Sequence, residues 1–162
     1  MSDHILSHID PLGRAQMVDV TPKDPTHRRA LARGKVKMLP ETTAMVASNA
    51  VAKGDVLAAA RIAAIQAAKR CADLIPLCHP LLVGAVSINF TLGDDFVEVE
   101  AGVETVDRTG VEMEALTAVS VACLTIYDMC KSADRSMTIS DVALWEKMGG
   151  RSGIWKRPSE SK

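Results

Sequence analysis

The segment from Gly110 to Met129 constrains the fold more than any other, because it has the length of a helix and is apolar almost all the way round. Its apolar residues are not confined to one stripe, and they include Val111, Leu116, Val119, Ala122, Leu124 and Ile126. A helix of this kind is normally buried on more than one side. The chain has 162 residues, of which 48% are hydrophobic, so it can bury this helix in one core without a disulfide. We therefore expect one domain built around this helix, with a second subunit covering part of it.

Two segments before this helix alternate between apolar and polar residues, which is the pattern of half-buried strands. In residues 86–92 the apolar positions alternate with serine, asparagine and threonine, and in residues 97–104 they alternate with Glu98, Glu100 and Glu104. Gly93-Asp94-Asp95 lies between the two segments and is a turn sequence. The pattern predicts one β-hairpin with a solvated face.

The other predicted elements complete an α+β pattern. We expect a short strand at 35–39, a short helix at 40–48, a long helix with Asp55 as its N-cap that ends at Lys69 and Arg70, and a last strand around 137–139. The order strand, helices, strand, strand, helix, strand predicts a ferredoxin-like antiparallel sheet with helices packed on one face. The open face of such a sheet would be covered by self-association.

The remaining segments are predicted to be loops and tails. Residues 19–34 and 72–83 are rich in residues typical of loops. We expect residues 1–16 and 154–162 to be flexible tails around a single catalytic domain at 17–153.

Composition excludes several classes of function. Lys and Arg number 19 and Asp and Glu number 20, so the formal net charge of −1 argues against a general nucleic-acid binder. We find no signal peptide at the N-terminus and no run of about 20 apolar residues, so we expect a cytoplasmic protein without a membrane span. The four cysteines, at positions 71, 78, 123 and 130, form no Cys-x-x-Cys pair. We therefore expect reduced thiols and no bound metal.

Two loop motifs carry candidate chemistry. Lys53, followed by Gly54 and Asp55, places a cation just before a helix N-terminus, where backbone N–H groups can receive phosphate. The alternative is a capped helix with a solvated lysine. His79, in Leu77-Cys78-His79-Pro80, titrates near neutrality and is suited to acid–base work. A buried loop histidine with a satisfied hydrogen bond is the alternative.

The apolar helix has charged residues at both of its ends. Thr109 and Glu112 fit a capping box, whereas Glu114 does not and needs a partner or a ligand. Asp128 and Lys131 are three residues apart and share a helix face, so they are either an exposed ion pair or an acid–base unit. Two basic segments, 27–29 and 149–153, complete the set and are suited to an anionic ligand.

Several motifs in a fixed order resemble those of the cyclic pyranopterin monophosphate synthase family of molybdenum-cofactor biosynthesis. They are Met17-Val18-Asp19-Val20, Lys53-Gly54-Asp55-Val56, Ala67-Ala68-Lys69-Arg70, Leu74-Ile75-Pro76-Leu77-Cys78-His79-Pro80-Leu81, Thr109-Gly110-Val111-Glu112-Met113-Glu114-Ala115-Leu116-Thr117 and Ile126-Tyr127-Asp128-Met129-Cys130-Lys131. The resemblance covers residues 15–153. It implies a lyase that converts a GTP-derived 3′,8-cyclised dihydro-nucleotide triphosphate to cyclic pyranopterin monophosphate and releases pyrophosphate. It also implies that no redox cofactor is needed and that a homohexamer, built as a trimer of dimers, has its active sites at the dimer interface.

The resemblance assigns roles to individual residues. Asp128, Lys53 and Lys131 match the catalytic positions. The substrate-binding positions are matched by Leu77, Cys78, His79, Glu112, Met113 and Glu114, and the basic positions near the phosphates by Arg28, Lys69 and Lys147. Two other classes stay open, a non-catalytic nucleotide-binding ferredoxin-like module and a structural oligomer without activity.

Overall fold

Strand β1 (Thr26–Lys37) lies inside the sheet and pairs along its length with β3 (Phe96–Asp107) on one side and β4 (Thr138–Met148) on the other. β2 (Ala85–Leu92) and the two-residue β5 (Trp155–Lys156) form the edges, so the order is β2-β3-β1-β4-β5 with every pair antiparallel. This computed structural model describes residues 9–158. It confirms the α+β, ferredoxin-like prediction.

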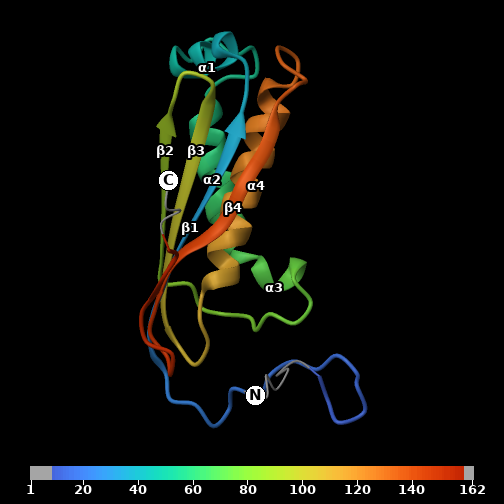
Figure 1. Cartoon of the computed structure of the whole chain (residues 1–162), viewed down its shortest axis with the longest axis vertical. Helices are drawn as coiled ribbons and strands as arrows, with labels where there is room; N and C mark the ends of the chain where they lie inside the picture. The colour runs from blue at the N-terminus through green and yellow to red at the C-terminus, as the bar shows by residue number, and fades with distance from the viewer. Residues whose placement is uncertain (1–8, 159–162) are drawn as a thin grey trace.

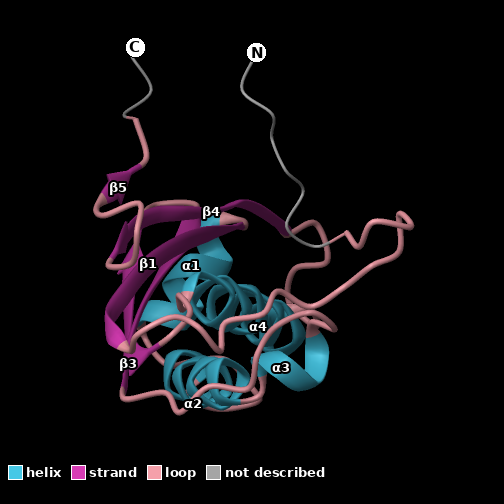
Figure 2. Cartoon of the chain, turned by 90° about the horizontal axis from the view of Figure 1, so that it is seen from below, coloured by secondary structure: helices cyan, strands magenta, loops and turns pink. Residues whose placement is uncertain are grey.

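The helices lie on one face of the sheet, as Figures 1 and 2 show. They are α1 (Pro40–Ala47), α2 (Val56–Lys69), the single turn α3 (Cys71–Leu74) and α4 (Glu112–Cys130). α1 lies at one end of the domain and α3 at the other, with α2 and α4 side by side between them. Asp55 accepts a hydrogen bond from the backbone N–H of Ala58 at 2.9 Å, which confirms the predicted cap of α2.

The sheet has one apolar face and one charged face. Val97, Val99, Ala101 and Val103 of β3 are buried under the helices. On the opposite face, Arg33 of β1 lies 2.8 Å from Glu100 of β3. The predicted hairpin with a solvated face is thereby confirmed, and two of its glutamates, Glu100 and Glu104, are paired with basic residues of β1.

α4 is the central helix of the domain. It packs on β1, β3 and β4 and beside α2, and it approaches the sheet closely at Gly34, where a Cβ atom would lie 2.5 Å from Val119 Cγ1. By length and composition alone, α4 could cross a membrane. Half of its apolar 18-residue stretch is buried inside the domain, as is usual for the core helix of a globular protein. Met113 and Leu124 remain 37% and 58% exposed on its outer side.

Two local predictions are wrong. Residues 26–34 are not a loop but the first three quarters of β1, because the charged side chains of Arg29 and Arg33 find glutamate partners on β3. Thr109 does not cap α4, since the N-cap is Val111 and no side chain caps this helix. Glu112 is thus the first helical residue and its side chain is not part of a capping box.

The predicted tails are described only in part. Residues 1–8 and 159–162 lie outside the described residues. Ile9 and Ala15 form an isolated antiparallel bridge in the N-terminal segment. In the C-terminal segment, Trp155 pairs with Lys147 through β5, and the N–H of Arg157 donates to the carbonyl of Trp145 at 2.8 Å.

Candidate functional site

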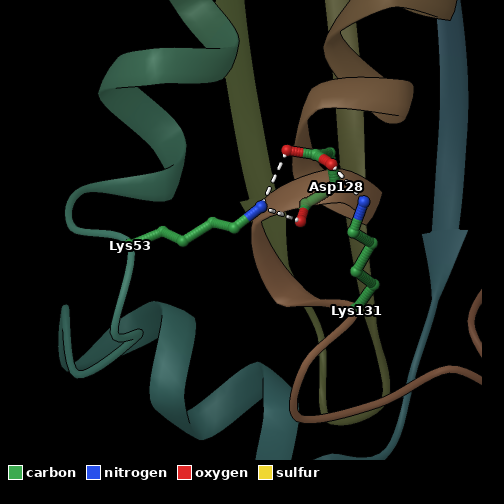
Figure 3. A network of polar contacts seen from close by, with 3 residues as sticks. All are labelled: Lys53, Asp128 and Lys131. Atoms are coloured by element: carbon green, nitrogen blue, oxygen red, sulfur yellow. Dashed lines mark hydrogen bonds and ion pairs between the residues drawn. The ribbon is translucent and has the colours of Figure 1, made fainter.

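Lys53, Asp128 and Lys131 meet at the C-terminal end of α4 (Figure 3). Lys53 Nζ lies 2.9 Å from Asp128 Oδ2 and also donates to the backbone carbonyl of Asp128 at 2.8 Å. Lys131 Nζ lies 2.6 Å from the other carboxylate oxygen of Asp128. We call these three residues the lysine–aspartate cluster. The predicted ion pair of Asp128 and Lys131 is confirmed, and Lys53 extends it.

Local structure explains how each member of the cluster is placed. Asp128 and Lys131 lie one helical turn apart, and Lys131 is the C-cap residue of α4. Lys53 belongs to the connection between α1 and α2, where Gly54 has a φ of +100°, a conformation open mainly to glycine. This turn lets Asp55 cap α2 while the Lys53 side chain reaches across to α4.

The electrostatics of the cluster are those of a carboxylate held between two cations. Hydrogen bonds from Lys131 and Lys53 lower the pKa of Asp128 to about 2. The three side chains are between 43% and 57% exposed, so charge attraction rather than burial decides this pKa. Asp128 is therefore ionised at neutral pH. Two ammonium groups and one carboxylate leave a surplus positive charge open to an anionic ligand.

A second group of predicted residues lines a cavity of about 300 Å³ at the other end of α4. The cavity lies between the segment after α3, the start of α4 and the segment before β1. Its lining residues are Val18, Val20, Lys23, Leu77, Cys78, His79, Leu81, Thr109, Gly110, Glu112, Met113 and Glu114. The structure thus brings together six of the eight residues predicted to bind substrate, and the other two, Arg28 and Lys69, do not line this space. We call it the histidine cavity.

Glu114 is the buried acid of the histidine cavity. It is 4% exposed, and burial raises the pKa of its carboxyl group. Among the described residues it forms no ion pair, and the Cys71 thiol is a hydrogen-bond partner of its side chain. The prediction that Glu114 needs a partner or a ligand stays a prediction as far as a ligand is concerned. Glu114 also borders a smaller cavity of about 90 Å³, where Lys69 and Arg70 are among the lining residues.

Two further predicted basic residues lie at the same end of the domain but outside these cavities. Arg28 donates to the backbone carbonyls of Asp107 and Arg108, each at 3.3 Å, and so contacts the segment that leads into α4. Lys147 Nζ donates to the carbonyl of Gly149 at 3.5 Å. Both side chains are held by the turns next to them and do not reach the histidine cavity in this conformation.

The two groups of site residues do not meet within one chain. Met113 and Asp128 are 15 residues apart on one straight helix, which corresponds to about 22 Å at 1.5 Å per residue. Figure 1 shows α1 and the C-terminal end of α4, which carries Asp128 and Lys131, at the end of the domain opposite α3. Within residues 9–158, no three His, Cys, Asp or Glu side chains are grouped as a metal site.

Sequence reasoning missed two polar residues. Lys23 lines the histidine cavity. In the sequence, the one feature that marks it is its place in a loop that also contains other charged residues. Asp134 is a buried carboxylate near the lysine–aspartate cluster. In the sequence, the feature that marks it is the Asp-x-Ser spacing, which is typical of a turn in which the aspartate side chain accepts a hydrogen bond from the backbone two residues on.

The fold and the two polar groups define an α+β protein of ferredoxin-like topology with sites suited to an anionic, multiply hydrogen-bonding ligand. The chain belongs to the MoaC family, whose model matches residues 17–150. It is 57% identical over 157 residues to the cyclic pyranopterin monophosphate synthase of Thermomicrobium roseum, covering 96% of this chain and 95% of that protein.

Mycobacterial relatives give the same result. The chain is 59% identical over 160 residues to cyclic pyranopterin monophosphate synthase 1 of Mycobacterium bovis and to that of Mycobacterium tuberculosis, with 97% of this chain and 94% of each relative covered. These comparisons confirm the resemblance drawn from the motifs, and the relatives are named as enzymes.

Proposed function

We propose that this protein is a cyclic pyranopterin monophosphate synthase of molybdenum-cofactor biosynthesis. It converts the 3′,8-cyclised dihydro-GTP to cyclic pyranopterin monophosphate and releases pyrophosphate, which is the chemistry of a phosphorus–oxygen lyase. The observation that carries the proposal is the lysine–aspartate cluster of Lys53, Asp128 and Lys131, in a chain 57–59% identical to proteins of that name.

The cluster suits the phosphate part of this reaction. Closing the cyclic phosphate forms a P–O bond from a sugar hydroxyl to the α-phosphorus and breaks the bond between the α-phosphorus and the leaving pyrophosphate, which takes up the proton that the hydroxyl loses. Negative charge develops on the leaving oxygen, and the ammonium groups of Lys53 and Lys131 are placed to neutralise it. Asp128 has a pKa of about 2, so at neutral pH it has no proton to donate and holds the two lysine side chains in place by ion pairs.

The histidine cavity suits the base of the same substrate. It offers His79, the backbone of the Leu77 to His79 segment, the half-buried carboxyl group of Glu112 and the buried one of Glu114. A guanine-derived ring presents several N–H donors and one carbonyl acceptor, and buried polar groups recognise such patterns with high selectivity. We predict that His79 contacts substrate rather than a metal ion.

A second copy of the chain completes the site in our proposal. The two groups lie about 22 Å apart on α4, and the exposed Leu124 lies on the helix between them. Two α4 helices packed antiparallel about a two-fold axis would place the lysine–aspartate cluster of one chain beside the histidine cavity of the other. The separation of the two groups therefore favours a homo-oligomer in which each active site is built from two chains. We predict a hexamer built as a trimer of dimers.

A further polar group supports an interface on the open face of the sheet. The indole N–H of Trp145 is buried without a hydrogen-bond partner among the described residues, and Arg33 lies over the same ring at 4.6 Å. Buried donors of this kind are normally satisfied, and an acceptor from another copy would reach this one only after the side chains that cover it had moved. We also predict a cytoplasmic enzyme, in keeping with four free cysteines, and one that uses no redox cofactor.

The direct test is turnover of the cyclised nucleotide by the purified protein. We expect pyrophosphate and cyclic pyranopterin monophosphate in equal amounts, and we expect Asp128→Asn to abolish both products. A protein that binds the nucleotide but leaves it unchanged would be the non-catalytic binding module instead. A protein that neither binds nor converts it would be a structural oligomer.

A further inference from the structure

Asp134 is a buried carboxylate in the connection between α4 and β4, and it is 3% exposed. Its Oδ1 accepts hydrogen bonds from the N–H and the hydroxyl of Ser136, at 2.8 and 2.6 Å. Its Oδ2 accepts from the N–H of Leu39 at 2.8 Å and from the hydroxyl of Thr42 at 3.4 Å. One side chain therefore binds two segments that are more than 90 residues apart in the sequence.

The two segments bound by Asp134 adjoin those that carry the lysines of the cluster. Asp134 follows Lys131 by three residues, and its N–H donates to the carbonyl of Cys130 at 3.1 Å, which makes the short stretch between them a closed turn. Leu39 is the N-cap residue of α1, and the connection that leaves α1 carries Lys53. Asp134 thus connects the end of α4 to the start of α1, the helix that precedes Lys53.

We propose that Asp134 is a positioning residue, which holds the α1 segment against the end of α4 and so keeps Lys53 and Lys131 on the two sides of Asp128. Its importance for catalysis rests on the proposed function, whereas its effect on the geometry of the cluster does not. The lysine–aspartate contacts are half exposed, and exposed ion pairs contribute little to holding two segments together. A buried carboxylate with all its hydrogen bonds satisfied holds them far better, because breaking those bonds leaves charged and polar groups unpaired.

The test is the pKa of Asp128 in the Asp134→Asn variant, measured by NMR titration of the ¹³C-labelled carboxyl groups and assigned with Asp128→Asn. In the wild-type protein both lysines lower this pKa to about 2. We expect the variant to titrate closer to the ordinary value of 3.8, because the lysines are no longer held beside the carboxylate. Turnover should fall by roughly tenfold, since misplaced catalytic groups lose rate.

Thr105→Val is the matched control. Thr105 is 4% exposed, and its hydroxyl donates to the carbonyl of Leu82 at 2.7 Å near the other end of the domain. This variant also loses a buried hydrogen bond, so it is expected to lower stability while leaving the pKa of Asp128 at its wild-type value. A shift of equal size in both variants would mean general loosening and would overturn the proposal.

Further outcomes are decisive as well. A folded Asp134→Asn protein with an unchanged pKa of Asp128 would overturn the positioning role. If Asp134→Asn does not fold, Ser136→Ala removes only the hydroxyl bond and should give a smaller shift in the same direction, and no shift would overturn the proposal. Wild-type protein that fails to convert the nucleotide would refute the proposed function, and the pKa shift would still test the role of Asp134.

Discussion

Lys53 donates two hydrogen bonds to a single residue, Asp128, one to the carboxylate at 2.9 Å and one to the backbone carbonyl at 2.8 Å. The backbone carbonyl is among the last of α4, where helix carbonyls lack intrahelical partners. A cation at this position also interacts favourably with the helix dipole. Lys53 is therefore both a partner of the Asp128 carboxylate and a cap for the end of α4.

Replacing Lys53 should separate these two roles. We expect Lys53→Ala to lower turnover by about 100-fold or more, as is typical for loss of a proton-transferring or charge-neutralising group. The free energy of unfolding should change by no more than about 0.5 kcal/mol, because exposed ion pairs are weak. Pyrophosphate release and denaturant unfolding are the measurements. Turnover near the wild-type rate would remove Lys53 from the catalytic set.

Asp128 and Lys131 should behave as one unit. Lys131 Nζ lies 2.6 Å from Asp128 Oδ1, so Asp128→Asn or Lys131→Met leaves the other residue without its oppositely charged partner. We expect each single variant to lose most turnover and the double variant to lose little more than either, which is the signature of coupled residues. Each variant is checked first for folding and assembly. Losses that multiply in the double variant would mean that the two residues act independently.

The pH dependence of the cluster has a definite sign. The pKa of Asp128 is about 2 in the folded protein against an ordinary 3.8, so its ionised form favours the folded state. This contribution is fully present above pH 3.8 and is lost as the pH falls through about 2. We expect ¹³C NMR to show Asp128 charged from pH 5 to pH 9. A titration midpoint of 3.8 or higher for the Asp128 carboxyl group would show that the two lysines do not stabilise its charged form.

Glu114 should act on stability in the opposite sense. Burial raises its pKa above the ordinary 4.5, so the folded state disfavours its charged form. The stability associated with the neutral form is present below pH 4.5 and is lost as the pH rises through the raised value. We expect Glu114→Gln to melt at a higher temperature than the wild type at pH 8 and at a similar temperature at pH 4. Equal melting temperatures of the two proteins at pH 8 would contradict the claim that burying the charged form of Glu114 lowers stability.

Gly34 tests the contact between the sheet and α4. A Cβ atom there would lie 2.5 Å from Val119 Cγ1 and 3.0 Å from Val142 Cγ2, which is overpacking of the core. We expect Gly34→Ala to lower the free energy of unfolding by about 1–3 kcal/mol. Val119→Ala should recover part of this loss when combined with it. A Gly34→Ala protein as stable as the wild type would mean that α4 does not approach the strand this closely.

Local periodicity was enough to predict the main elements. The hairpin, α2 and α4 each carry a strong repeat of period 2 or 3.6, and the pairing of Asp128 with Lys131 follows from their spacing on one helix. β1 was predicted too short because its buried positions are alanine and glycine, as at Ala30 and Ala32, which give a weak hydrophobic signal. The partners of its arginines lie on β3, about 70 residues away.

The site was predictable only in part from local pattern. The contact between Lys53 and Asp128 joins residues 75 positions apart, and only the family resemblance placed them in one set. Asp134 escaped notice because a buried carboxylate leaves no periodic mark and its partner Leu39 is defined by tertiary structure alone. The spacing along the helix already placed Glu114 and Asp128 at opposite ends of α4, whereas only the fold brought His79 to the first end and Lys53 to the second.

Subunit complementation tests most directly the claim that two copies of the chain build one active site. Lys53→Ala alters only the lysine–aspartate cluster, and His79→Ala alters only the histidine cavity, so each variant alone should be inactive. When the two are unfolded together and refolded as a mixture, half of the dimers pair one chain of each kind. One of the two sites in such a dimer is intact, so we expect about one quarter of wild-type pyrophosphate release. A mixture as inactive as its components would contradict the composite site.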